Sequence, residues 1–225
     1  MGVLMRRVLI GAGIAGLMVV GAATAAPAMG ATPLTYRVTI ENRTQADLTP
    51  VVYAVHDRTA RMWRNGRRAS FGMTRLAEDG VPDIVRNEVA RRRGVRSAGV
   101  ANRIAAGRSI SFTVRTTTRH RRLSWASMLV CTNDGFTGQS SYALPLKRNG
   151  RTRFSVRVNA RAYDGGSEVN DERSSSVPCL GAHGVGRDER RVIRRHPGIS
   201  GRGDLTVTSH GWGQNAARVT IRRIR

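Results

Sequence analysis

Short segments in which apolar and polar residues alternate limit what this chain can fold into more than any other feature. The clearest are residues 36–42, 109–116 and 151–159, where apolar side chains occupy every second position. A period of two is typical of a β-strand with one buried face. Further strands are predicted at residues 51–57, 123–130, 143–146, 205–209 and 217–224. A total of about eight strands favours a mainly β fold, an antiparallel β-sandwich, over a parallel α/β enzyme.

One segment, residues 82–94, is predicted to form a short helix. Pro82 and Asp83 are typical of a first turn, Arg91 to Arg93 would lie in the last turn, and Gly94 would end the helix. This order of charges suits the helix dipole, so the three arginines have a structural explanation in this interpretation.

A long C-terminal loop is predicted at residues 174–202, which are polar, rich in Gly and Arg, and without periodicity. The histidines of this loop, His183 and His196, lack the paired spacing of a zinc site. Arg202-Gly203-Asp204 forms an RGD tripeptide, but Gly-Asp before a strand is also ordinary turn chemistry.

Residues 1–31 have the features of a secretory signal peptide. Arg6 and Arg7 precede an apolar run at residues 8–20, and small residues suited to cleavage follow it. The run is shorter than the ~20 residues of a membrane span, so no transmembrane span is expected after cleavage. We therefore expect a single domain at residues 32–225, secreted to an extracellular or periplasmic space, by an export route that the sequence leaves open.

Export would place the two cysteines, Cys131 and Cys179, in an oxidising compartment where they can form a disulfide. Free buried thiols are the alternative. Cys131 stands three positions before Asp134, so a bridge would also hold the loop that carries this acid.

The chain carries 38 Lys and Arg residues against 15 Asp and Glu, a net charge of +23. All of the basic residues except Lys147 are arginine, and most are spread along the chain. Aromatic residues make up 5% of the sequence, too few for an obvious base-stacking platform. We expect weak, salt-sensitive binding to polyanions and no specific recognition of nucleic acid.

The acids that do occur gather in two glycine-bearing loops that follow predicted strands. Asp134 lies in the first loop, and Asp164 and Glu168 lie in the second. If the loops meet, they supply three anionic oxygen donors, which suit Ca²⁺. On spacing alone, an Asp-Gly turn and solvated loop acids are the favoured interpretation, because Asp-Gly turns are common.

His56, Asp57 and Ser70 are residue types that occur together in catalytic groups. Neighbours in a strand point to opposite faces, so His56 and Asp57 do not easily share a proton. The sequence also lacks a G-x-S-x-G elbow. We therefore expect no catalytic residues and no enzyme activity.

Several of these segments resemble the spondin N-terminal domain family. Residues 123–138 are similar to its "LS..SM....DWF.G" segment, residues 163–168 to its "DAGTD" loop, residues 56–80 to its "H....LW..G..AS.G...LAE.G" run, and residues 36–42 to its opening "Y.V...N". The resemblance implies a β-sandwich similar to C2 domains, with a calcium site at one end. By position, Asp134, Asp164 and Glu168 match the acids of that site, although Glu168 replaces an aspartate.

The resemblance therefore favours a secreted, non-enzymatic, calcium-binding module for adhesion or surface interaction, whose partner is an unidentified protein or glycan at the cell surface or in the extracellular matrix. The alternative is an exported arginine-rich protein that binds polyanions through its basic surface, with the acidic loops serving only as structural turns. Oligomeric state is not indicated by the sequence.

Overall fold

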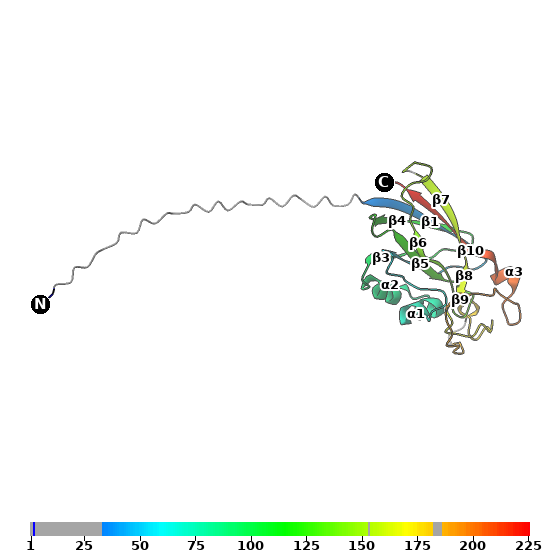
Figure 1. The fold of residues 1–225 in the computed structure, drawn as a ribbon. Coiled ribbons are helices and arrows are strands. Elements are labelled where there is room, and N and C mark those ends of the chain that lie inside the picture. The colour runs from blue at the N-terminus through cyan, green and yellow to red at the C-terminus, as the bar shows by residue number, and fades with distance from the viewer. Residues whose placement is uncertain (1, 3–32, 153, 182–185) are drawn as a thin grey trace. The chain divides into compact units, whose positions relative to one another are not determined.

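Two antiparallel sheets form the frame of the molecule, and helices cover part of one of them (Figure 1). The computed structural model describes residue 2 and residues 33–152, 154–181 and 186–225. The predicted signal peptide, apart from residue 2, and His183 lie outside the described residues. Among the described residues, no helix combines the length and the apolar character needed to cross a membrane.

The first sheet contains four strands, in the spatial order β4, β1, β10, β7. Their bounds are Ser109–Thr116, Leu34–Thr44, Trp212–Arg223 and Phe154–Ala160. Val38 of β1 lies opposite Phe112 of β4 and Ile221 of β10, so apolar residues line one face of all three strands. The alternating pattern that predicted these strands is confirmed, since it records a sheet with one buried face.

The second sheet contains six strands, in the spatial order β3, β2, β5, β6, β8, β9. Their bounds are Val95–Ala101, Val51–His56, Arg122–Met128, Gly135–Ala143, Ala162–Asp164 and Arg194–Arg195. The central strands β2 and β5 are buried on both faces. This explains why β2 is apolar from Val51 to Val55 rather than alternating, whereas in β5 the buried Ser124 and Ser127 interrupt the apolar residues.

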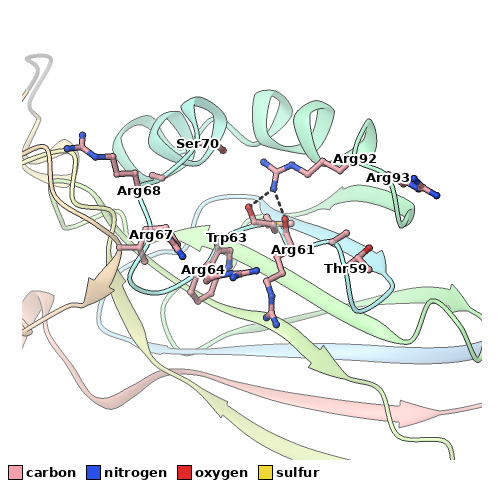
Figure 2. A pocket seen from close by; sticks show the side chains of 13 residues that line it. Thr59, Arg61, Trp63, Arg64, Arg67, Arg68, Ser70, Arg92 and Arg93 are labelled. Carbon is pink, nitrogen blue, oxygen red and sulfur yellow. Dashed lines mark hydrogen bonds between the residues drawn. The ribbon is translucent and has the colours of Figure 1, made fainter.

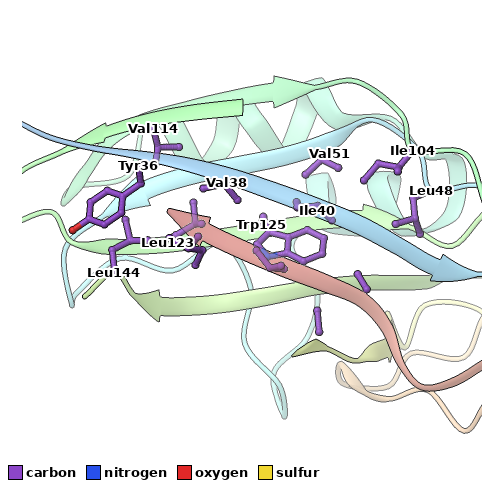
Figure 3. Packing of buried hydrophobic residues seen from close by; sticks show 14 of the residues in the cluster. Tyr36, Val38, Ile40, Leu48, Val51, Ile104, Val114, Leu123, Trp125 and Leu144 are labelled. Carbon is purple, nitrogen blue, oxygen red and sulfur yellow. The ribbon is translucent and has the colours of Figure 1, made fainter. Parts of the chain in front are cut away.

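The main core lies between the two sheets, and Trp125 is its largest fully buried side chain (Figure 3). Its neighbour Ala126 belongs to a second cluster on the opposite face of the same sheet, packed against α1 and α2. The molecule is thus a sandwich of two sheets with a helical layer on one side, which confirms the predicted mainly β, antiparallel sandwich class.

Three α-helices occur in the described chain: α1 (Phe71–Asp79), α2 (Pro82–Ala90) and α3 (Val207–His210). The Ser70 hydroxyl caps α1 by accepting a hydrogen bond from Met73 N, and Gly80 ends the helix with φ of 69°. A glycine tolerates this left-handed conformation, which favours it as a helix stop. The sequence analysis predicted one short helix, so it underestimated the number of helices.

The predicted helix at residues 82–94 ends four residues early, at Ala90. Arg91 to Arg93 leave the helix, and the guanidinium group of Arg92 donates hydrogen bonds to the carbonyl oxygens of Arg61 and Met62. The expectation that these arginines occupy the last helical turn is wrong, because Arg92 anchors the segment to the loop after β2 instead.

Two predicted strands are also wrong. Residues 205–209 contribute to α3, because the Thr206 hydroxyl accepts a hydrogen bond from Ser209 N and so begins a helix. Residues 143–146 hold no strand beyond Ala143, the last residue of β6. Since β3, β6, β8 and β9 were not predicted, the observed ten strands exceed the expected eight or so.

Cys131 and Cys179 form the predicted disulfide across 48 positions of sequence. Around it, Cys131, Val177 and Leu205 pack as a small separate apolar cluster. The bridge therefore ties the largely irregular segment after β8 to the turn that precedes β6.

Candidate metal centre

The two acidic loops meet at one end of the six-stranded sheet. Gly135, the first residue of β6, pairs with Asp164, the last residue of β8. The amide of Gly165 then donates a hydrogen bond to the Asp134 carbonyl oxygen at 3.0 Å. Strand pairing thus brings together loops that are about thirty residues apart in sequence.

Asp134 is completely buried and is held by the second loop. Its Oδ2 accepts hydrogen bonds from Ser167 N at 2.7 Å, from Ser167 Oγ at 3.0 Å and from Glu168 N at 3.0 Å. Its Oδ1 is buried and has no hydrogen-bond partner among the described residues. A buried carboxylate oxygen without a partner is costly, and it is the kind of atom that a bound cation satisfies.

Asp164 is also completely buried, and its two oxygens are both engaged. Oδ1 accepts from Gly166 N at 2.8 Å, and Oδ2 accepts from Asn170 Nδ2 at 2.6 Å. The guanidinium group of Arg194 lies 2.8 Å from Oδ2 and also contacts Glu189 at 2.6 Å. Arg194 is therefore the positive charge that this structure places against the acids.

Glu168 completes the predicted set. Its side chain is buried, and Oε1 accepts a hydrogen bond from Gly186 N at 2.7 Å. Gly186 allows this close approach, because a Cβ atom built on it would lie 2.6 Å from Glu168 Oε2. The amide that holds Glu168 thus comes from the predicted long loop.

Burial and mutual repulsion raise the pKa values of these acids. Burial raises the pKa of the Asp134 carboxyl above its usual range. Burial, followed by the charge of Asp134, raises the pKa of Asp164 to about 6. Burial raises the pKa of Glu168 to about 7, and the charges of Glu78 and Asp134 add to this rise. A bound cation would reduce the repulsion among these poorly solvated carboxylates.

The donor chemistry fits Ca²⁺, since all three side chains offer carboxylate oxygens and one of these oxygens lacks a partner. Their oxygens are not all within 4.8 Å of one another, however. Among the described residues, the group of metal-ligating side chains that meets this distance is Cys131, Cys179 and His210, in which the disulfide occupies both sulfur atoms.

Several members of the site were missed by sequence reasoning. Glu78 of α1 and Glu189 add negative charge around the predicted acids, and Arg194 and Gly186 supply contacts to them. Glu78 lies in the run that resembles the spondin family, so its carboxylate could have been recognised in the sequence as a possible part of the site. The other three lie in a segment without periodicity, which offered no signal of where it folds.

The residues considered for catalysis have structural roles. His56 is buried, with Nδ1 2.7 Å from the Asp57 carbonyl oxygen and Nε2 2.8 Å from Ser124 Oγ. Ser70 instead donates a hydrogen bond to Glu88 at 2.6 Å. The three residues considered for catalysis therefore do not form a hydrogen-bonded group.

The RGD tripeptide lies in a turn that is held by hydrogen bonds to neighbouring residues. Asp204 is exposed, yet its Oδ2 accepts a hydrogen bond from Ser174 N at 2.7 Å and its amide donates one to the Glu172 carbonyl oxygen at 2.7 Å. A Cβ atom at Gly203 would lie 2.4 Å from that same carbonyl oxygen. These contacts are the turn chemistry that the sequence also allowed.

In a comparison with known families, the chain matches the family model described as Spondin_N over residues 36–177. The match covers more than half of the chain and includes Asp134, Asp164 and Glu168. It ends before Cys179, Arg194 and β10, so these parts of the fold lie outside the matched region. A search of curated proteins finds no match.

Proposed function

The chain belongs to the spondin N-terminal family, and from that premise we propose that it is an exported, non-enzymatic adhesion module whose acidic loops bind Ca²⁺. The family is extracellular and suggests an adhesion-type role. The disulfide suits an oxidising compartment. Asp134, Asp164 and Glu168 are the side chains that would hold the ion.

The unpartnered Oδ1 of Asp134 is the observation that carries this proposal. It is a hard oxygen donor, buried beside two other carboxylates whose pKa values are raised to about 6 and about 7. A divalent ion would neutralise this charge and join the loop before β6 to the loop after β8. The adhesive surface would then have a fixed shape, set by loops that both contact the ion.

Titration calorimetry of the metal-free protein with CaCl₂ tests the proposal. We expect one site with a Kd of about 0.1 to 1 mM, as in other extracellular calcium modules. Asp164→Ala should abolish the binding heat. Asp83→Ala removes an acid whose side chain is 67% exposed on α2, and it should bind Ca²⁺ like the native protein.

Tb³⁺ luminescence provides a second readout, because Tyr163 stands next to Asp164 and its ring centroid lies 4.7 Å from that of Trp63. We expect aromatic-sensitised emission from the native protein and its displacement by excess Ca²⁺. Binding heat and emission that are the same in native protein and Asp164→Ala would remove the metal from the proposal and leave an extracellular module whose acidic loops are structural.

A further inference from the structure

A groove lined by arginines lies between the loop after β2 and the end of α2 (Figure 2). Its volume is about 360 Å³, within the range of small-ligand sites. The arginines that line it are Arg61, Arg64, Arg67, Arg68, Arg92 and Arg93. In Figure 2, Arg68 and Arg93 lie at opposite ends of the group, with Arg61 and Arg64 between them.

The groove holds positive charge that the protein does not neutralise. None of its 13 lining residues is Asp or Glu. Arg92 has an ion-pair partner in Glu88, at 3.7 Å, but the other five arginines form no ion pair with any described residue. All 15 acids of the chain are among the described residues. Uncompensated like charge disfavours folding, so its concentration here indicates an anionic ligand.

The backbone under the arginines is held in place before any ligand arrives. Gly66 N donates a hydrogen bond to the Ile193 carbonyl oxygen at 2.8 Å, and Ile193 N donates to the Arg67 carbonyl oxygen at 2.9 Å. Trp63 Nε1 donates to the Trp125 carbonyl oxygen at 3.2 Å. Such preorganisation lowers the entropy lost on binding.

A second basic cavity of about 400 Å³ continues the groove, because Thr59 lines both. Its other lining residues are Asp57, Arg58, Thr118, Arg119, Arg121 and Arg122. Asp57 is the one acid among them, and its Oδ1 accepts hydrogen bonds from the amide and the hydroxyl of Thr59, at 2.8 and 2.6 Å. The two cavities together form an extended basic path, which suits a linear polymer better than a single small anion.

The side chains that line the path indicate which class of anionic polymer it can bind. Guanidinium groups are weakly hydrated and bind oxoanions, such as carboxylates, phosphates and sulfate esters, through paired N–H donors. Because the spondin family is extracellular, the acidic polymers that such a module meets include sulfated glycans. Single-stranded nucleic acid requires exposed aromatic rings on which bases stack. Trp63 is the one aromatic residue lining either cavity, and it is 5% exposed with its ring packed edge-on against Phe136.

We propose that the arginine groove is a binding site for an acidic glycan carrying sulfate esters, which runs from the Arg68 end of the groove through the cavity beyond Thr59. Asp134, Asp164 and Glu168 do not line either cavity, although Arg68 also borders a third cavity that Gly165, Gly166 and Ser167 of the second acidic loop help to line. We therefore expect glycan binding to persist when a chelator removes Ca²⁺. A failure of the calcium proposal would leave this proposal intact.

Titration of the full-length protein with a heparin-derived octasaccharide tests the site, with calorimetry as the readout. Arg64→Ala/Arg67→Ala/Arg68→Ala removes three exposed guanidinium groups and should weaken binding by about tenfold. It should also reduce the dependence of affinity on salt, because fewer counterions are released. The thermal midpoint of this variant should stay close to that of the native protein.

Arg37→Ala/Arg108→Ala/Arg157→Ala is the matched control. These arginines are exposed, do not line the cavities described, and form no ion pair with a described residue, so the variant has the same net charge as the groove variant. We expect its affinity for the octasaccharide to change less than about twofold. Equal losses in the two variants would show that binding follows net charge alone and would overturn the groove assignment.

Three further probes test the ligand class. The desulfated octasaccharide should bind at least about tenfold more weakly than the sulfated one, because carboxylates alone leave several guanidinium groups unpaired. Polyphosphate and a single-stranded oligonucleotide of matched charge should bind more weakly as well. Tighter binding of either one would overturn the glycan assignment in favour of a phosphate polymer.

Discussion

Asp134 Oδ2 lies 3.0 Å from the amide nitrogen of Glu168, although 34 positions of sequence separate the two residues. Together with two hydrogen bonds from Ser167, this contact makes one carboxylate oxygen the anchor of the whole loop after β8. The loop is thus fixed by Asp134 whether or not a metal binds.

Asp134→Ala should therefore lower the free energy of unfolding in metal-free buffer by about 3 kcal/mol, because it leaves buried N–H and O–H donors without an acceptor. Asp134→Asn keeps an acceptor oxygen and removes a buried charge, so it should lose less than half as much. Urea unfolding in EDTA measures both values. Equal losses in the two variants would contradict the anchoring role of the carboxylate oxygen.

Arg194 is a positive charge that the structure places against the acidic loops. Because its guanidinium group contacts Asp164 and Glu189, Arg194→Gln should cost about 2 kcal/mol of stability in EDTA. Millimolar Ca²⁺ should recover part of this loss, since the ion would neutralise the same carboxylates. The neighbouring Arg195→Gln, which removes an exposed arginine, should change stability little in either buffer. A similar loss at Arg195 would show that total charge, not this contact, matters.

The sequence identified the strands whose burial is simple. β1, β4 and β7 alternate because one face is buried, whereas β2 is apolar from Val51 to Val55 because both of its faces are buried. β6 was missed because its buried positions include Gly135, Thr137 and Ser141, which have no apolar periodicity. β6 forms between β5 and β8, and these pairings are long-range contacts that the sequence of β6 alone does not show.

The residues of the candidate site also fall into those that the sequence predicted and those that it did not. Asp134, Asp164 and Glu168 were predicted because each matches an acid in a family motif, and strand pairing brings their loops together. Arg194 was not, because the segment that supplies it folds back through single contacts such as that between Gly186 N and Glu168 Oε1. The arginine groove was hidden for a related reason, since Arg91 to Arg93 were assigned to a helix that ends at Ala90.

The packing of α1 on α2 depends on Gly72. A Cβ atom there would lie 2.6 Å from the backbone nitrogen and Cα of Val85, closer than atoms pack. Gly72→Ala should cost about 2 kcal/mol by forcing the helices apart. Gly213→Ala is the control, because no atom lies within 4 Å of its added carbon, and it should stay within about 0.5 kcal/mol of the native protein. Equal denaturation midpoints for the two variants would refute the close helix contact.

The disulfide closes a loop of 48 positions, so its removal in Cys131→Ser/Cys179→Ser should cost about 4 kcal/mol. The native protein unfolded under a strong reductant should show a similar loss, which separates the bond itself from the serine substitutions. A change below about 1 kcal/mol in both measurements would indicate that the unfolded chain is already constrained in this region.

His196 makes stability depend on pH. Burial lowers its pKa from 6.5 to about 4, an effect that the nearby charge of Glu172 opposes and that of Arg194 reinforces. The ring packs edge-on against Trp212, Nδ1 accepts a hydrogen bond from Gly198 N, and Nε2 is buried without a partner among the described residues. The folded state therefore keeps the neutral ring, while the unfolded chain binds a proton near pH 6.5.

The stabilisation by neutral His196 is thus complete above about pH 6.5 and is lost as the pH falls toward 4, over which it amounts to about 3 kcal/mol. His196→Phe keeps an aromatic ring and cannot titrate, so the difference in unfolding free energy between native protein and variant should shrink, or shift in favour of the variant, by that amount between pH 7.5 and 4. Measuring the difference cancels the buried carboxylates, which titrate in both proteins. A difference that stays constant across this range would show that His196 has the same pKa in the folded and unfolded states.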